Sequence, residues 1–358
     1  MARVPFRIKV SLWLLAFLLA VPLLGPFLVP VPRLEGLSDP EGVAGPESLF
    51  VSVEGVQLHV ETWPAGTTPE DVAARGDAIA GHDDPAQGRL GVIMLHGFGS
   101  QTRTWRHLGA ALADSQLTPS VTLAFDRPAF GLSERPERAS WGRGRNPYGQ
   151  EAQVAYTLGL MDAYGLDRAL LVGHSAGGTL ALEVALVAPE RVAGLILVSP
   201  AVYAGGGAPA WTRPLLSTPQ LERLGPLLMR SFAGRPGEDF LRAAYFDPDA
   251  LDPLDEAAYR RALQVEGWDR ALWELVKASR ESDLESFVTR IEAPTLVLTG
   301  DTDAIVPRAQ SERLARELPD ASFRALPECG HVAHEECPEG VIVALQDWLS
   351  EAAARLLD

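Results

Sequence analysis

The chain has few of the residues that mark several specialised classes of protein. Only two of its 358 residues are cysteine, which excludes a small fold held together by many disulfides. Its 33 glycines and 28 prolines follow no repeat, and 47% of its residues are hydrophobic, which excludes collagen and bulk disorder. The composition is that of a globular protein with room for one large domain or two small ones.

Positive charge is also scarce. Lysine and arginine total 31 against 47 aspartate and glutamate residues, a net charge of −16. The first 32 residues hold Arg3, Arg7 and Lys9 and no acid, so the remainder carries −19. Nucleic-acid binding needs clustered basic side chains that neutralise phosphates, so nucleic acid is excluded as a partner.

Residues 1–32 predict a membrane anchor or signal segment. Residues 10–31 carry no charge and follow the three basic residues. As a helix they would span roughly 33 Å, enough for a hydrocarbon core of about 30 Å, and the basic flank places the body outside the cytoplasm. Three prolines shorten the unbroken run to residues 10–21, which also suits a cleaved signal of a secreted or periplasmic protein. A single-pass anchor, a cleaved signal and a buried core helix all remain open.

The next residues predict a linker and a hairpin. Residues 33–48 are rich in glycine, proline and acids, which is typical of a linker that lifts the body off the membrane. Residues 49–53 and 56–62 are strand-like runs joined by a Glu-Gly pair, and residues 64–89 are polar and predict a long surface loop.

A regular alternation of strands and helices follows. Strand candidates span residues 91–95, 121–125, 169–172, 195–198, 295–298 and 322–326. Helical candidates span residues 105–113, 150–164, 179–188, 309–318 and 340–356. Continuous apolar runs are typical of parallel strands buried on both faces, so the pattern predicts an α/β fold with a mostly parallel sheet flanked by helices.

About ninety residues, 201–292, interrupt this alternation. They hold no comparable strand run but contain aromatic residues at helical spacing, among them Trp211, Phe232, Tyr245, Phe246, Tyr259, Trp268 and Trp273. We expect a helical cap inserted between two late strands of a single domain over residues 49–358. The aromatic side chains either line an apolar pocket or pack the cap helices against one another.

The sequence Gly173-His174-Ser175-Ala176-Gly177 follows a strand candidate directly and precedes a helix. A sharp turn between this strand and this helix would expose the serine hydroxyl at the carboxyl edge of the sheet. Such a turn leaves no room for side chains two residues on either side of the serine, which explains the glycines. Ser175 is therefore the predicted nucleophile.

A nucleophilic serine needs a base and an acid that orients the base. His331 and His334 are the histidines in a loop after the last strand candidate, and His331 is favoured because Gly330 frees its backbone. The acid should follow an intervening strand, where Asp303 can reach the histidine while Asp301 is placed to cap the turn.

Two backbone amides are predicted to form an oxyanion hole. Residues 91–95 lead into a turn that contains His96 and Phe98, and the Phe98 amide can face the Ala176 amide across the serine. His96 is predicted to hold this turn by hydrogen bonds.

The order Ser175, Asp303, His331, with His96-Gly97 upstream, resembles the α/β-hydrolase fold family over roughly residues 49–356. The turn at residues 126–133 resembles the same family, except that Ala129 stands where relatives commonly have glycine. The resemblance implies a lid where the cap is predicted, and a choice among esterases, lipases, lactonases, carbon–carbon bond hydrolases and related enzymes.

A serine nucleophile narrows that choice to acyl transfer through an acyl-enzyme. The leading prediction is an esterase-like serine hydrolase acting on a small apolar acyl substrate, with no cofactor. The alternatives are a lactonase, a carbon–carbon bond hydrolase, an acyltransferase, or a non-catalytic ligand-binding or signalling module on the same fold.

Cys329 and Cys337 flank His331 and His334. Three interpretations remain open: a short disulfide that fixes the loop, a metal site, and two unpaired thiols.

Overall fold

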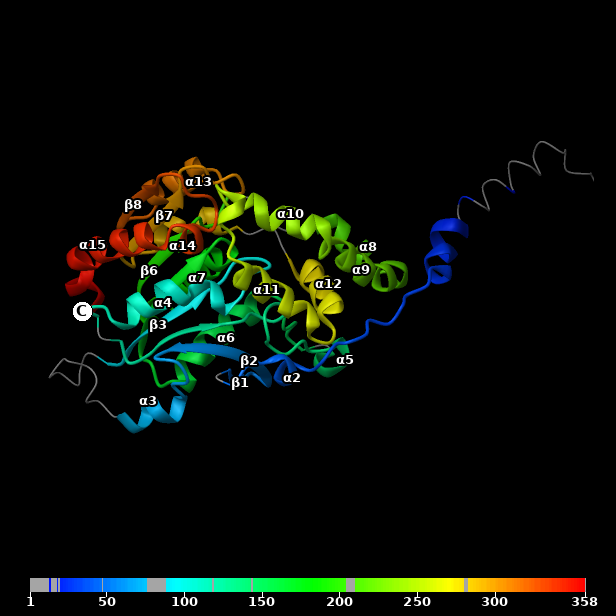
Figure 1. Ribbon diagram of the computed structural model, residues 1–358, viewed down its shortest axis with the longest axis horizontal. Coiled ribbons are helices and arrows are strands. Elements are labelled where there is room, and N and C mark those ends of the chain that lie inside the picture. Colours follow the sequence, from blue (N-terminus) through cyan, green and yellow to red (C-terminus); the bar gives the residue numbers. More distant parts are fainter. Residues whose placement is uncertain are drawn as a thin grey trace, which may run out of the picture.

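The computed structural model describes residues 13, 18, 20–46, 48–75, 88–117, 119–142, 144–203, 210–279 and 283–357. Within them, eight strands form one sheet in the order β1-β2-β4-β3-β5-β6-β7-β8 (Figure 1). The strands are β1 (Leu49–Val53), β2 (Val56–Trp63), β3 (Leu90–Leu95), β4 (Thr122–Phe125), β5 (Arg168–His174), β6 (Val192–Val198), β7 (Thr295–Gly300) and β8 (Ala321–Leu326). β2 is antiparallel to β1 and β4, and the remaining neighbours are parallel. The predicted mostly parallel sheet is confirmed.

The predicted hairpin is present between β1 and β2. Its two turn residues, Glu54 and Gly55, have φ angles of 53° and 78°. Two consecutive left-handed residues are what a tight two-residue hairpin turn requires, and this places the antiparallel pair at one edge of the sheet.

Helices cover both faces of the sheet. On one face lie α6 (Gln150–Ala163), α7 (Ala176–Val187) and α13 (Arg308–Glu317), and on the other lie α4 (Arg106–Ala113) and α15 (Pro338–Leu357). Successive strand side chains point to opposite faces, so Ile93 and Leu95 pack with the first group while Val92 and Met94 pack with the second. The short helices α3 (Pro69–Arg75), α5 (Arg138–Trp141) and α14 (Ala333–Glu336) lie in the connections.

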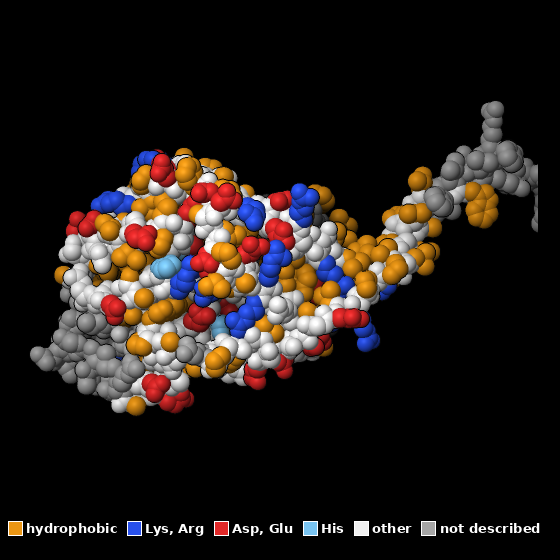
Figure 2. Space-filling model, viewed as in Figure 1, with side chains coloured by type: hydrophobic (Ala, Val, Ile, Leu, Met, Phe, Trp, Pro, Cys, Tyr) orange, Lys and Arg blue, Asp and Glu red, His pale blue; other side chains and the backbone are white. Residues whose placement is uncertain are grey.

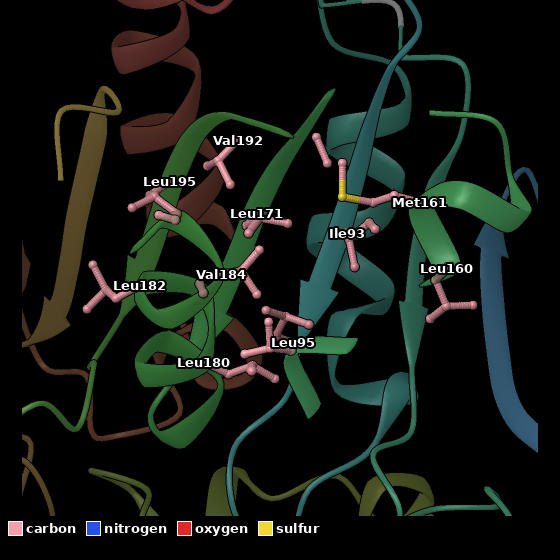
Figure 3. Close-up of a cluster of buried hydrophobic side chains, with 14 of the residues drawn as sticks. Ile93, Leu95, Leu160, Met161, Leu171, Leu180, Leu182, Val184, Val192 and Leu195 are labelled. Carbon is pink, nitrogen blue, oxygen red and sulfur yellow. The ribbon is translucent and has the colours of Figure 1, made fainter. Parts of the chain in front are cut away.

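The core beneath α7 fixes the element that carries the site. Figure 3 shows Leu180 and Val184 of α7 pointing toward Leu95 and Leu171 of the central strands. All four side chains are at most 3% exposed. This packing holds the amino-terminal end of α7 against the carboxyl ends of the strands, where sites form in α/β proteins.

Between β6 and β7 the chain forms the helices α8 (Arg213–Leu216), α9 (Pro219–Phe232), α10 (Arg235–Ala243), α11 (Pro253–Arg261) and α12 (Trp268–Ala278). They gather on one side of the sheet and form the helical cap expected from the sequence (Figure 1). In α9, Pro226 sits inside the helix and is buried.

The segment predicted as a linker lies against this cap. It contains α2 (Pro40–Val43), and Ser38 exchanges backbone hydrogen bonds with Gln264 and Glu266, at 3.0 and 2.8 Å. Arg261 of α11 also donates to the Val43 carbonyl, at 2.7 Å from Nη2. The glycine, proline and acidic residues of this segment predict only its local backbone. They do not indicate which distant residues it contacts.

Residues 20–28 form a helix at the amino-terminal end of the described chain. No helix among the described residues is long and apolar enough to cross a membrane, so the structure does not support the span predicted over residues 10–31. Residues 10–12, 14–17 and 19 of that span lie outside the described residues.

Candidate active site

Ser175 occupies the sharp turn between β5 and α7. Its φ and ψ angles are 52° and −118°, a conformation that is strained for any residue with a side chain. Gly177 is needed in the same turn, because a Cβ at that position would overlap the Leu95 carbonyl oxygen and lie 2.7 Å from that of His96. The motif therefore has the geometry predicted from the sequence, a strained serine in a turn too crowded for side chains.

His331 lies in the loop after β8, and Asp303 lies in the turn after β7. The His331 Nδ1 and an Asp303 carboxylate oxygen are 2.8 Å apart. The other oxygen of Asp303 accepts the backbone N–H groups of Ile305 and Val306, at 2.9 and 2.8 Å. Both side chains are buried, so the carboxylate and the ring hold each other in one orientation.

Ser175 and His331 line the same cavity, which has a volume of about 210 Å³. The structure thus brings the predicted nucleophile and base to one space, with the predicted acid bonded to the base. The larger apolar side chains that line the cavity are Phe98, Phe130, Phe232, Phe240, Leu241, Leu251, Leu263, Trp268, Leu272, Ile305 and Val332. Most of them come from the cap. Of the cap aromatic residues singled out in the sequence, three line this cavity, two are buried and two are exposed: Phe232, Tyr259 and Trp268; Tyr245 and Trp273; Trp211 and Phe246.

Asp301 and His334, the alternatives considered for the acid and the base, occupy structural positions. Asp301 accepts the backbone N–H of Glu328 at 3.0 Å and caps the turn, as its position predicts. His334 is buried with its ring centroid 4.5 Å from those of Trp105 and His174. Burial lowers the pKa of His334 to about 3, so its ring is neutral at pH 7.

The turn predicted to supply an oxyanion donor lies directly beside the serine. A Cβ added to Gly97 would lie 3.2 Å from the Ser175 Cβ. Phe98 follows in this turn, and Ala176 is the first residue of α7, where backbone N–H groups point outward toward an anion. The residues predicted to supply the two donors therefore both lie in segments next to Ser175.

His96 holds this turn, as predicted. Its Nδ1 donates to the Gly97 carbonyl at 2.7 Å, and its Nε2 accepts the backbone N–H of Arg127 at 2.9 Å. Burial lowers the pKa of His96 to about 3, so it remains neutral and can both donate and accept.

Two further side chains position His331 and were not singled out from the sequence. His174 donates from Nε2 to the His331 carbonyl at 3.0 Å, and its burial lowers its pKa well below the ordinary value. Glu336 accepts backbone N–H groups from Gly330 at 2.7 Å and from the cap residues Phe246 and Asp247 at 3.1 and 2.9 Å. The contacts of His174 with His331 and of Glu336 with the cap join residues about 90 or more positions apart, so no local pattern reveals them.

Cys329 and Cys337 form a disulfide, with a Cα–Cα distance of 6.2 Å. The bond closes the loop that carries His331, and Thr302 ties this loop to β7 by donating from its hydroxyl to the Cys329 carbonyl at 2.7 Å. The disulfide takes up both sulfur atoms that the metal interpretation requires. The described residues contain no group of three or more side chains suited to a metal ion.

Ala129, the departure from the family pattern, has a left-handed φ of 82° and lines the cavity. Glycine adopts this φ without strain, whereas alanine does so at a cost of roughly 1–2 kcal/mol. The turn at residues 126–133 therefore keeps its left-handed residue although that residue is alanine instead of glycine.

Comparison with known proteins identifies the class of this protein. The chain belongs to the alpha/beta hydrolase fold family, which it matches over residues 92–338. It is 30% identical over 272 residues to a 2-hydroxymuconate semialdehyde hydrolase of Pseudomonas putida, covering 73% of this chain and 88% of that one. The family, the fold and this relative define the protein as a hydrolase.

Two solved structures share the fold. A thermophilic esterase from Thermogutta terrifontis has a TM-score of 0.61 at 22% identity, covering 85% of this chain and 98% of the other. A bacterial membrane phospholipase A has a TM-score of 0.58 at 22% identity, covering 96% of this chain and 98% of the other. At such identities the likeness concerns the fold alone.

Proposed function

We propose that the protein is a serine hydrolase that cleaves carboxylic esters of small apolar acyl groups through an acyl-enzyme. The observation that carries this proposal is the shared cavity of Ser175 and His331, with Asp303 bonded to the histidine. The apolar wall of the cavity supports an apolar substrate. The chemistry needs no cofactor.

In the proposed reaction the Ser175 Oγ attacks the carbonyl carbon of the ester while the His331 Nε2 takes the hydroxyl proton. The tetrahedral intermediate collapses, the C–O bond to the leaving group breaks, and His331 protonates the departing alkoxide. Water then enters, gives a proton to His331 and attacks the acyl-enzyme, and the proton returns to Ser175 as the acid leaves. Asp303 orients the ring and stabilises its charged form.

The amides of Phe98 and Ala176 are the proposed donors to the oxyanion. Loss of one such donor typically costs about 2.7–4 kcal/mol of transition-state stabilisation. His96 acts through Phe98, because it fixes the turn by the hydrogen bond to the Gly97 carbonyl.

A carbon–carbon bond hydrolase is the second candidate, favoured by the relative that acts on 2-hydroxymuconate semialdehyde. Among the residues that line the cavity, the arginines are Arg242 and Arg260. Arg260 is already paired with Glu238 at 2.9 Å and Glu256 at 2.8 Å, and Arg242 donates to the Pro248 carbonyl at 3.4 Å. The two glutamates that line the same cavity, Glu238 and Glu256, balance the charge of the two arginines. A neutral ester therefore fits this environment better than an anionic substrate does.

The test compares both substrate classes on the full chain. p-Nitrophenyl esters of increasing acyl length are assayed beside 2-hydroxymuconate semialdehyde, with Ser175→Ala as the matched control. Turnover of the esters that disappears in Ser175→Ala supports the proposal. Faster turnover of the semialdehyde establishes the second candidate, and tight ester binding without turnover would make the protein a binding module. Preferential ring opening of lactones, or acyl transfer to an alcohol in place of water, would indicate a lactonase or an acyltransferase.

We also propose that residues 1–32 attach the protein to a membrane, with the hydrolase domain outside the cytoplasm. The uncharged run of residues 10–31 after three basic residues supports attachment, and the Cys329–Cys337 disulfide supports an oxidising compartment. Carbonate extraction of membranes should leave the chain in the pellet with its amino terminus intact. A soluble chain that begins after residue 20 would establish the cleaved, secreted or periplasmic alternative.

A further inference from the structure

Large apolar side chains of the cap are exposed. Trp211 is 74% exposed, and Leu215 of α8 and Leu228 of α9 are each 53% exposed. Phe232 at the end of α9 and Phe240 of α10 are also exposed. We refer to these five residues as the cap face. Figure 2 shows hydrophobic side chains gathered where the cap meets the amino-terminal segment.

The amino-terminal helix adds to this apolar surface. In residues 20–28, Leu23, Leu24, Phe27 and Leu28 are exposed. A soluble protein seldom leaves so many large apolar side chains in one region, and such a region marks an interaction surface.

Side chains of α9 bond this helix to the cap. Gln220 donates to the Leu23 carbonyl at 3.1 Å, and Arg223 donates to the carbonyls of Pro26 and Val29 at 3.1 and 3.0 Å. Pro30 has no N–H to bond the Pro26 carbonyl within the helix, so an external donor is required there. Arg230 of α9 also donates to the carbonyl of Pro32, which follows this helix, at 2.7 Å.

The cap face reaches the mouth of the active-site cavity. Phe232 and Phe240 line that cavity and are also exposed on the surface. Their rings lie 6.4 Å apart, and the ring of Phe98 lies 6.3 Å from that of Phe232. An aromatic path therefore leads from the cap face to the residue beside Ser175.

We infer that the cap face and the amino-terminal helix together rest on an anionic phospholipid bilayer, and that the acyl substrate enters the cavity from the lipid. The inference rests on the proposed ester hydrolysis, for which it names the source of the substrate. The apolar side chains enter the boundary between headgroups and acyl chains, as they do for helices that lie in the plane of a membrane.

The charge distribution favours this orientation and an anionic lipid. Residues 210–243 hold five arginines and three acids, whereas the whole chain has a net charge of −16. An anionic surface repels the acidic body and attracts residues 210–243, so the side of the cap that carries α8, α9 and α10 turns toward the bilayer.

The test uses the full chain and vesicles of phosphatidylcholine, alone or mixed with phosphatidylglycerol. A combined Trp211→Ser/Leu215→Ser/Leu228→Ser variant removes part of the cap face and leaves the residues assigned to the active site in place. Val187→Ser/Val343→Ser is the matched control, because these exposed apolar residues lie on α7 and α15. Hydrolysis of a long-chain ester dissolved in the vesicles is compared with hydrolysis of water-soluble p-nitrophenyl butyrate.

The cap variant is expected to lose roughly tenfold or more of its vesicle activity and to keep its activity on the soluble ester, since only the first route requires contact with lipid. The control variant should keep both activities, and wild type should be faster on the mixed vesicles. If the cap variant keeps its vesicle activity, the inference is overturned while ester hydrolysis stands. Dimers in solution that dissociate in the cap variant would also overturn it, because the face would then bind a second copy of the chain.

A second measurement keeps the inference testable if no ester is hydrolysed. Brominated phosphatidylglycerol should quench tryptophan fluorescence, and part of that quenching should disappear in Trp211→Phe. Equal quenching of wild type and Trp211→Phe would show that Trp211 does not enter the lipid, which refutes the proposed contact whatever the reaction is.

Discussion

Replacing Asp303 with asparagine is expected to remove nearly all activity while leaving the fold intact. The oxygen that accepts the Ile305 and Val306 N–H groups, at 2.9 and 2.8 Å, must remain an oxygen, because an amide NH2 there would oppose two donors. The new NH2 group is therefore forced to face the His331 Nδ1, which lies 2.8 Å from the carboxylate oxygen it replaces.

That geometry places His331 in the wrong tautomer. Because the amide donates to Nδ1, the ring proton must sit on Nε2, and Nε2 can no longer take the Ser175 proton. In a serine triad this change lowers kcat about 10⁴-fold, which corresponds to about 5.5 kcal/mol of activation free energy.

The assay is kcat and KM for p-nitrophenyl butyrate, with circular dichroism to verify folding. Asp301→Asn is the matched control: its side chain accepts the Glu328 N–H from outside the cavity, and its kcat should stay within about threefold of wild type. An Asp303→Asn variant with a tenth or more of wild-type kcat, or equal losses in both variants, would refute the tautomer argument.

Three further predictions concern stability. Burial raises the pKa of Glu335 to about 8, so its contribution to stability is complete below pH 4.5 and is lost as pH rises through 8. Denaturant titrations of wild type should show a loss of up to about 5 kcal/mol across this window, and Glu335→Gln should reduce that loss. An equal pH dependence of the two proteins would contradict the burial argument. Removing the disulfide with Cys329→Ala/Cys337→Ala should lower the free energy of unfolding by about 2–3 kcal/mol, because the bond closes a short loop and so restricts the unfolded chain only moderately. An unchanged free energy of unfolding would mean that the bond does not constrain the unfolded chain. Gly177→Ala should lower the free energy of unfolding by about 3 kcal/mol, because the added methyl group would overlap the Leu95 and His96 carbonyls. A Tm equal to that of wild type would show that the turn can move to make room.

The strands and the candidate site residues could be predicted from the sequence because their signals are local. Strand β3 covers residues 90–95, and its prediction over residues 91–95 was confirmed because strands buried on both faces are continuously apolar. Residues 173–177 could be interpreted from the turn alone, since the same crowding that strains Ser175 demands glycine at position 177.

The ends of helices were harder to predict from the sequence where the helix propensity of the residues disagrees with their packing in the fold. α7 begins at Ala176, three residues before the predicted start at residue 179. Gly177 and Gly178 disfavour helix by roughly 1 kcal/mol each relative to alanine, so the sequence indicates a turn. In the folded protein the buried side chains of α7 outweigh that preference.

Long-range contacts left no signal in the sequence. Glu336 bonds the Phe246 amide 90 residues away, and the segment over residues 33–48 bonds Gln264 and Arg261. Each contact pairs ordinary polar groups whose partner is set by the arrangement of the cap. The predicted membrane span rests on an uncharged run and its basic flank, and no described helix is long and apolar enough to cross a membrane.

The central claim, that the Ser175 Oγ is the nucleophile, is tested most directly by labelling the full chain with a fluorophosphonate and identifying the modified peptide by mass spectrometry. We expect one adduct per chain, located on Ser175, with labelling abolished by Ser175→Ala and strongly slowed by Asp303→Asn. An adduct on another residue, or a chain that stays unlabelled while still hydrolysing esters, would contradict the claim.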